Sequence, residues 1–357
     1  MDNTLNNMKL SNIEMLRVLS IILIMFHHYA LGLSDTSSGG ITFNRVFFET
    51  LFCFSHIGVN CFVLITGFFS SNKEINYNRI VSLVFQTKIY ALSLFVIAVL
   101  IKAQKASLNN IIQNLFPIIT GRYWFVSTYI LLYLLSPYIN IVVENLTKKK
   151  MQVLIALLAI VVCFLPTLTL DFFYSRLLWF VLLFLCGRYY AIYKKELIKK
   201  VNPKKCLLYA IIVFVLLVLS VVVFDYIGCN ISEEIGSKHY TFAVGNKVPQ
   251  MVVSSLLFIY FENLKIQKNS LINFLSSCTF GIYLVHSGSG ERIIWDHLFN
   301  ASQYNNSVYM PIIVFGLVGL MLCIGIVVHV AYKKMENLLL KKAEQRLALK
   351  LERMTGK

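Results

Sequence analysis

Arg17 and His28 are the two residues of this sequence whose types and spacing could do chemistry. The eleven steps between them turn a helix by roughly three full turns and 20°, so both side chains share one face, separated by roughly 16 Å of rise. Glu14 lies three residues before Arg17, within reach of an ion pair on that face. The segment around them is apolar, and a charged group in a membrane span costs about 2.5–3.5 kcal/mol on insertion scales. This stripe of Glu14, Arg17 and His28 on one helix face therefore predicts a functional site.

The chemistry that suits His28 is the removal of a proton from a hydroxyl, because the unperturbed pKa of imidazole is about 6.5. The alternative is a core histidine that is bonded to a neighbouring backbone or hydroxyl group. His27 points to another side of the same helix, so we interpret it as a supporting residue.

A second group of polar residues lies in the next apolar segment. His56 and Asn60 are four residues apart and therefore neighbours on one helix face. They could belong to the site or simply bond helices together. Gly58 and Gly67 in the same segment predict close approach of other helices.

Cations near the third apolar segment are candidates for binding the phosphates of a cytosolic donor. Lys88 lies within the segment, and Arg79 and Lys73 precede it. The alternative for Lys88 is that its ammonium group extends to the membrane surface.

Aromatic and polar residues at the outer ends of later segments are candidates for sugar binding. Trp124 and its neighbour Tyr123 open one segment, where an interfacial aromatic belt would also explain them. Tyr283 and His286 lie three residues apart in another, followed by a polar stretch at 291–297 that an ordinary outer loop would also explain. Asn140 is expected to mark the inner end of its helix.

The elements that must position these residues are transmembrane helices. The chain has 357 residues, of which 57% are hydrophobic and 14% charged, with a mean hydropathy of +0.70. Long apolar stretches recur from end to end, which predicts an all-α integral membrane bundle of about ten spans. The predicted spans are 13–33, 46–69, 79–101, 123–143, 151–170, 174–193, 206–227, 246–262, 270–290 and 308–332.

The net charge of +16 follows this topology. With the N-terminus inside, 23 lysines and arginines fall in cytoplasmic segments and 8 in outer segments, so both termini are expected in the cytoplasm. Little basic surface is left for nucleic acid. The first span could instead be a cleaved signal peptide, but Glu14, Arg17 and the paired histidines argue against it.

The chain divides into a polytopic domain at 1–332 and a basic amphipathic tail at 333–357. The tail is expected on an anionic inner leaflet, with a solvated basic tail as the alternative. The eight cysteines form no Cys-x-x-Cys unit, and no metal site is predicted. Membrane lipids are expected partners, and homo-oligomerisation stays open.

Six motifs occur in order along most of the chain: Glu14-x-x-Arg17 with His28, Asn60-Cys-Phe-Val-Leu-Ile-Thr66-Gly67-Phe, Tyr123-Trp-Phe, Leu135-Ser-Pro137-Tyr-Ile-Asn140, Gly187-Arg-Tyr, and Gly281-Ile-Tyr283-Leu-Val-His286. This ordered set resembles the acyltransferase family 3 membrane proteins, in particular those that modify bacterial surface polysaccharides. The resemblance implies ten transmembrane helices and transfer of an acyl group, usually acetyl, from cytosolic coenzyme A to a hydroxyl of an extracytoplasmic glycan. It also implies that Arg17 and His28 are the functional pair.

The chain departs from the family pattern at two places that matter. Glu14 stands where an aspartate is typical. The Arg-x-x-Arg motif is incomplete, because Ser82 stands three residues after Arg79, which leaves the donor phosphates to Lys73, Arg79 and Lys88.

These observations predict an acetyl-CoA-dependent O-acyltransferase in the cytoplasmic membrane of a bacterium. In this interpretation Glu14 orients Arg17, and His28 is a general base or a transient acyl carrier. Its acceptor would be a polysaccharide or a lipid-linked precursor, and no metal is required. The alternative is a glycan transporter or flippase in which Arg17 and His28 line the path.

Overall fold

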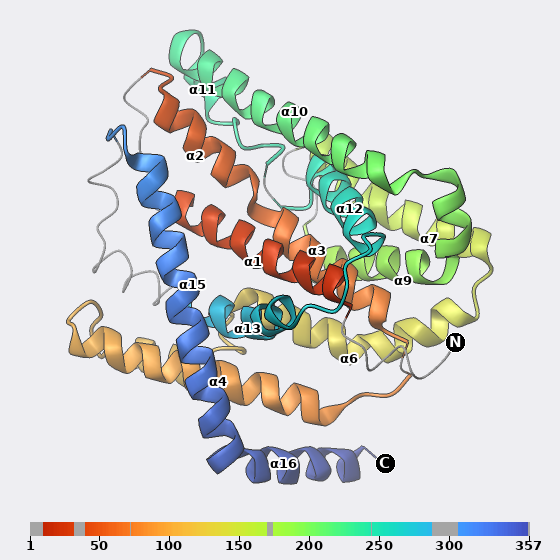
Figure 1. Cartoon of the computed structure of the whole chain (residues 1–357), viewed down its shortest axis with the longest axis vertical. Helices are drawn as coiled ribbons and strands as arrows, with labels where there is room; N and C mark the ends of the chain where they lie inside the picture. The colour runs from red at the N-terminus through yellow and green to blue at the C-terminus, as the bar shows by residue number, and fades with distance from the viewer. Residues whose placement is uncertain are drawn as a thin grey trace. The chain divides into compact units, whose positions relative to one another are not determined.

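The computed structural model describes residues 10–31, 40–71, 73–169, 174–243, 245–287 and 306–355, and the regular elements in these ranges are all helical (Figure 1). In chain order the helices are α1 (Ser11–Leu31), α2 (Phe43–Cys53), α3 (Ser55–Phe69), α4 (Tyr77–Leu100), α5 (Leu108–Leu115), α6 (Trp124–Glu144), α7 (Lys148–Ala159), the π-helix η2 (Ile160–Phe164), α8 (Leu165–Leu168), α9 (Arg176–Lys200), α10 (Pro203–Asn230), α11 (Glu233–Gly236), α12 (Val248–Glu262), α13 (Ser270–His286), α15 (Met310–Met335), the π-helix η4 (Glu336–Leu340) and α16 (Lys341–Met354).

The predicted all-α membrane architecture is confirmed. Within the described ranges, eight helical stretches are long and apolar enough to cross a membrane. Two shorter apolar helices, α12 and α13, occupy the eighth and ninth predicted spans. The protein is therefore a multi-pass membrane protein with about ten spans.

Two predicted spans are less regular than the sequence suggested. The second span is divided at Phe54 into α2 and α3. The fifth contains η2 between α7 and α8, where the amide of Asn246 donates to the carbonyl of Val162 and the Lys247 ammonium to that of Pro166. These side chains satisfy backbone oxygens in and beside a stretch that departs from α-helical hydrogen bonding.

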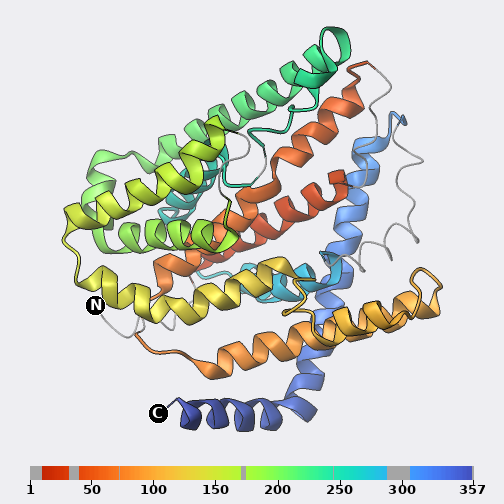
Figure 2. The same cartoon turned by 180° about the vertical axis from the view of Figure 1, so that it is seen from behind.

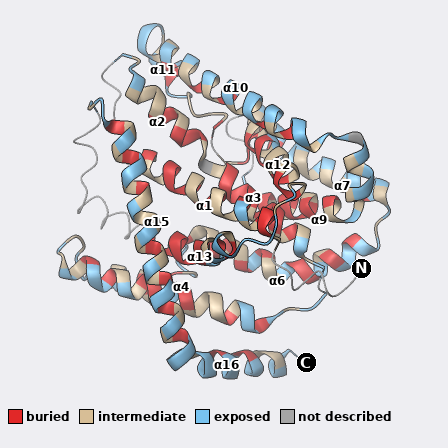
Figure 3. Cartoon of the chain, in the orientation of Figure 1, coloured by how far each residue is buried: buried red, intermediate tan, exposed pale blue. Residues whose placement is uncertain are grey.

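The helices group into two compact units. The first comprises Met1–Ser70, Val142–Ser277 and Ser302–Val318, and the second comprises Ser71–Ile141, Cys278–Ala301 and Gly319–Lys357. In the first unit α3 packs against α1, α9 and α12, while α10 packs against α12 and α2. Figure 3 shows that α3 is largely buried, whereas α10 exposes much of its length. The exposed apolar side chains of α10 are those expected of a lipid-facing helix.

Glycines allow the first unit to pack backbone against backbone. A Cβ at Gly58 of α3 would collide with the carbonyl oxygen of Ser20 in α1. A Cβ at Gly67 would collide with the carbonyl oxygen of Phe184 in α9, and one at Gly187 of α9 with that of Leu64. The predicted close approaches at Gly58 and Gly67 are therefore confirmed, and α3 is held on two sides.

We expect Gly187→Val to destabilise the protein by about 3 kcal/mol or more, which is the upper end of the range typical of overpacking. The colliding atom is a backbone oxygen, which cannot move aside as a side chain would. Thermal unfolding of the purified protein in detergent measures the effect. Gly319→Val is the matched control, because a Cβ at Gly319 meets nothing within 4 Å. Equal melting temperatures for the two variants would contradict this account.

In the second unit α16 runs alongside α4, as Figures 1 and 2 show from opposite sides. Tyr77 and Val81 of α4 enclose Ala348 of α16 in a small buried cluster. The tail predicted from residue 333 thus begins as a continuation of α15, passes through η4, and packs on α4 as α16.

Candidate functional site

Helix α1 carries the predicted stripe without interruption. It is helical from Ser11 to Leu31, so Arg17 and His28 share a face as their spacing predicted. Both are partly buried. The Arg17 Nε atom lies 3.8 Å from the Glu14 carboxylate, which confirms the predicted ion pair.

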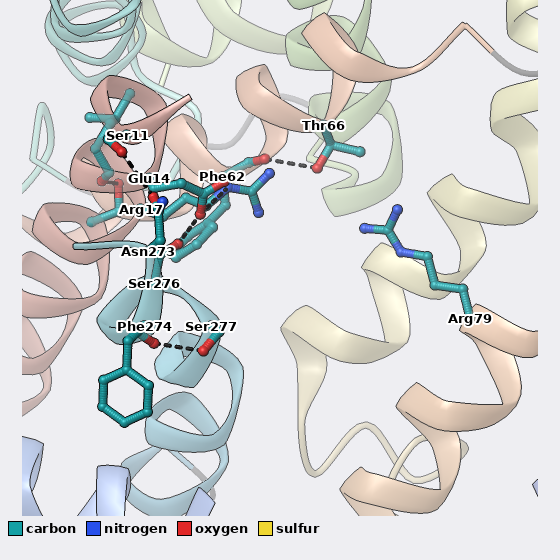
Figure 4. A network of polar contacts seen from close by, with 12 residues as sticks. Ser11, Glu14, Arg17, Phe62, Thr66, Arg79, Asn273, Phe274, Ser276 and Ser277 are labelled. Carbon is teal, nitrogen blue, oxygen red and sulfur yellow. Dashed lines mark hydrogen bonds and ion pairs between the residues drawn. The ribbon is translucent and has the colours of Figure 1, made fainter. Parts of the chain in front are cut away.

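Glu14 is held from a second helix. The Ser276 hydroxyl of α13 donates to the Glu14 carboxylate (Figure 4). Beside it, the Ser11 hydroxyl donates to Asn273 Oδ1 at 3.1 Å and accepts from the Asn269 backbone N–H at 2.9 Å. The start of α1 is therefore fixed to the start of α13, and the position of Arg17 follows from it. The sequence analysis missed these α13 residues, since serines and asparagines near a helix start resemble ordinary caps.

A further bond anchors the same end of α1. The Asn12 side chain donates to the backbone carbonyl of Glu262 at 2.8 Å, and the Glu262 carboxylate accepts from Lys194 and Tyr190. Helices α1, α9 and α12 thus meet at one polar junction in the first unit.

His27 supports the helix next to His28. Its Nδ1 atom lies 3.0 Å from the Phe52 carbonyl of α2, and its ring packs edge-on against the Phe52 ring with centroids 4.8 Å apart. The His27 and His28 rings are 5.7 Å apart. These contacts join α1 to α2 at His27, and its supporting role in the site stays a prediction.

His56 and Asn60 have different partners although they share a face of α3. The Gly245 N–H donates to His56 Nδ1 at 3.1 Å, and since a backbone N–H can only donate, a neutral His56 carries its proton on Nε2. The fully buried Asn60 accepts a hydrogen bond from Trp179 Nε1 at 3.0 Å and thereby joins α3 to α9.

The three cations predicted to bind donor phosphates all belong to the second unit. Arg79 is exposed, donates to the Tyr129 hydroxyl at 2.9 Å and lies over the Tyr133 ring. Lys88 is also exposed, and its ammonium group lies 5.9 Å from the centre of the Phe116 ring. Nine residues separate Arg79 from Lys88, about half a turn beyond two full turns, so they occupy opposite faces of α4. Lys73 is exposed in the segment before α4.

The residues predicted to bind a sugar gather around the start of α6. Tyr283 is buried with its ring 5.4 Å from Phe125 and 6.1 Å from Tyr123, and Trp124 packs edge-on against Phe125. His286 lies beside Tyr283, and its Nδ1 atom is 2.7 Å from the Ile282 carbonyl. Nδ1 therefore carries the proton of the neutral ring.

The structure rejects the interfacial alternative for Tyr123, directly before α6, and corrects the expectation for Asn140 within it. Tyr123 is fully buried and donates to the Leu284 carbonyl at 3.1 Å, so it is a core residue instead of an interfacial one. Asn140 does not end the helix, which continues to Glu144, and it is fully buried. In both cases packing against other helices overrides what the local sequence suggested.

A buried charged triad in the first unit also escaped the sequence analysis. Arg45 of α2 pairs with Asp225 of α10, and its Nε atom lies 3.8 Å from Glu49. Both carboxylates are about 97% buried, since each residue exposes 3% of its surface. The spacing of Arg45 and Glu49 and the lone acid in the apolar α10 were the available signals.

The chain is a multi-pass helical membrane protein that carries an arginine and a histidine on one face of α1. A family model described as an acyltransferase domain, that of acyltransferase family 3, matches residues 10–330. The chain therefore belongs to acyltransferase family 3, as its motifs suggested, and is a membrane acyltransferase. Searches of curated proteins and of solved structures gave no match. The polar stretch at 291–297 lies outside the described residues.

Proposed function

We propose that this acyltransferase moves an acetyl group from cytosolic acetyl-CoA to a hydroxyl of an extracytoplasmic polysaccharide or its lipid-linked precursor. The observation that carries the proposal is the stripe on α1, where Arg17 is fixed through Glu14 and Ser276 while His28 lies three turns further along. The membership in acyltransferase family 3 supports the reaction class. The charge asymmetry between loops supports a bacterial cytoplasmic membrane with both termini inside.

In the proposed reaction His28 acts as a general base. Its imidazole takes the proton of the acceptor hydroxyl while the hydroxyl oxygen attacks the thioester carbonyl. The tetrahedral intermediate then collapses, the carbon–sulfur bond breaks, and the departing thiolate takes the proton. The reaction needs no metal and no net proton uptake. Arg17 holds the donor or polarises its surroundings, and Glu14 orients Arg17.

The remaining candidates would bind the two substrates. Arg79 and Lys73 are proposed contacts for the donor phosphates. Lys88 is a third proposed phosphate contact, on the face of α4 opposite Arg79. Tyr283, His286 and Trp124 would contact the sugar, and His56 and Asn60 would line the site in the first unit.

Membrane vesicles supplied with labelled acetyl-CoA test the proposal directly. We expect the label to appear in glycan. Surface polysaccharide from cells that express the chain should also gain about 42 mass units per modified repeat, because an acetyl group replaces the hydrogen of a hydroxyl. Vesicles that carry glycan across the membrane without transferring label would instead favour the transporter.

A further inference from the structure

A line of buried polar side chains in the second unit has no role in the reaction described above. On α4, Ser82, Gln86 and Tyr90 recur every four residues, so they share one face. On α15 and η4, Tyr332 and Glu336 also lie four apart. We call the surface where these faces meet, together with His329 and Glu344, the polar seam.

Direct contacts join the two sides of the polar seam. The Ser82 hydroxyl donates to Glu336 Oε1 at 3.1 Å, and Lys333 pairs with the other oxygen of the same carboxylate. The rings of Tyr90 and Tyr332 are 5.4 Å apart. His329 packs against α13, where a Cβ at Gly281 would come within 2.6 Å of His329 Nδ1.

Several polar atoms of the seam are buried without a partner. His329 exposes 6% of its surface, Tyr332 4% and Glu344 7%. Their atoms His329 Nδ1, Tyr332 Oη and Glu344 Oε1 make no hydrogen bond with any described residue. Buried polar groups are normally paired, and leaving one unpaired costs about as much as the lost hydrogen bond. Three such atoms along one seam indicate a site for a polar ligand.

We infer that the polar seam binds the pantetheine arm of the acyl donor, an inference that rests on the proposed function. This arm carries two amides and a hydroxyl but no charge. Inside a membrane protein its amides need hydrogen-bond partners, because the bilayer core offers none. The seam supplies hydroxyl, imidazole and carboxyl groups that need partners too, so each set satisfies the other.

The length and the charge of the seam fit this ligand. From Ser82 to Tyr90, and from His329 to Glu336, the seam extends about 10–12 Å by helical rise. At one end Lys333 is partly exposed and adjoins Ser82 through their shared contact with Glu336. Ser82 stands at the second arginine position of the incomplete Arg-x-x-Arg motif, and Lys333 places a cation beside it. The Lys333 ammonium group would face the donor phosphates.

Helix α16 covers the seam, since Glu344 contributes to it and Ala348 packs on Tyr77 and Val81 one turn further along. Only Ala348 of α16 is fully buried in the cluster that holds α16 on α4, with Leu351 partly buried beside it. Helix α16 joins α15 through the π-helix η4, a kind of irregularity that often marks functional sites. Entry of the arm would therefore displace α16.

Two donors test the inference on the full-length protein in lipid nanodiscs: acetyl-CoA and acetyl-pantetheine, which lacks the nucleotide. We expect Tyr90→Phe/Tyr332→Phe to raise KM for both donors about tenfold or more, with kcat at saturation and KM for the acceptor unchanged. Lys333→Gln should raise KM for acetyl-CoA alone. Tyr138→Phe, which alters an exposed tyrosine of the same unit, is the matched control.

The outcomes separate this inference from the proposed function. Unchanged donor KM values in the double variant would overturn the inference. If the wild-type protein transfers no acetyl group, the proposed function fails. Thermal stabilisation by CoA then tests binding to the polar seam separately from acetyl transfer. If CoA stabilises the wild type but not the double variant, the inference is supported. If CoA stabilises both equally, the inference is overturned.

Discussion

Replacing His28 with alanine is expected to lower acetyl transfer by about 10²–10⁴-fold, the usual contribution of a general base. Its ring is partly buried on the internal stripe of α1, and no other imidazole occupies the same position on that face. Transfer of label from acetyl-CoA to glycan in vesicles measures the effect. Because the substitution removes the base and not a donor contact, thermal stabilisation of the protein by CoA should persist.

His239→Ala serves as the control for this prediction. His239 lies in the loop after α11, where its Nδ1 atom bonds the Gly236 carbonyl, so its loss should leave transfer intact. Transfer by His28→Ala within twofold of the wild type would refute the role of His28 as a base. Acetyl label on the protein itself, at His28, would identify an acyl carrier instead.

The second large effect is expected at Arg17. Arg17→Ala should reduce transfer about 10–100-fold, the size of a lost hydrogen bond to a charged group. Glu14→Ala should cost less, and Ser276→Ala least, because each acts on Arg17 from one step further away. Initial rates in vesicles at saturating acceptor rank the three variants.

The double variant Glu14→Ala/Arg17→Ala distinguishes positioning from a purely structural ion pair. If Glu14 only orients Arg17, the double variant should be as inactive as Arg17→Ala alone, since residues acting through one another are not additive. A structural pair predicts the opposite: removal of both charges should restore activity, because no uncompensated charge is left in the membrane.

The fold was largely predictable because apolar length and charge asymmetry act on whole segments. The span that became α1 is correct to within about two residues. Local breaks were not predictable. The division at Phe54 and the π-helix η2 depend on partners distant in sequence, such as Asn246 for the Val162 carbonyl.

For the candidate site, spacing within one helix could be predicted and contacts between helices could not. The ion pair between Glu14 and Arg17 followed from their separation of three residues. The bond from Ser276 to Glu14 joins positions 262 residues apart, and no periodicity in a single sequence reveals such a pair. Tyr123 shows the same limit, since its burial depends on contacts with Tyr283 and Leu284, which are distant in sequence.

The glycine contact between α3 and α1 has a consequence for anyone who wishes to redirect this enzyme. Gly58 meets α1 at Ser20 and Ile24, both of which lie between Arg17 and His28. Rotation or sliding of α1 is therefore blocked at the centre of the stripe, so its two ends keep a constant depth and direction. To obtain new acceptor specificity, α1 and α3 should be left unchanged and the outer loops varied, since changes there leave the relative positions of Arg17 and His28 intact.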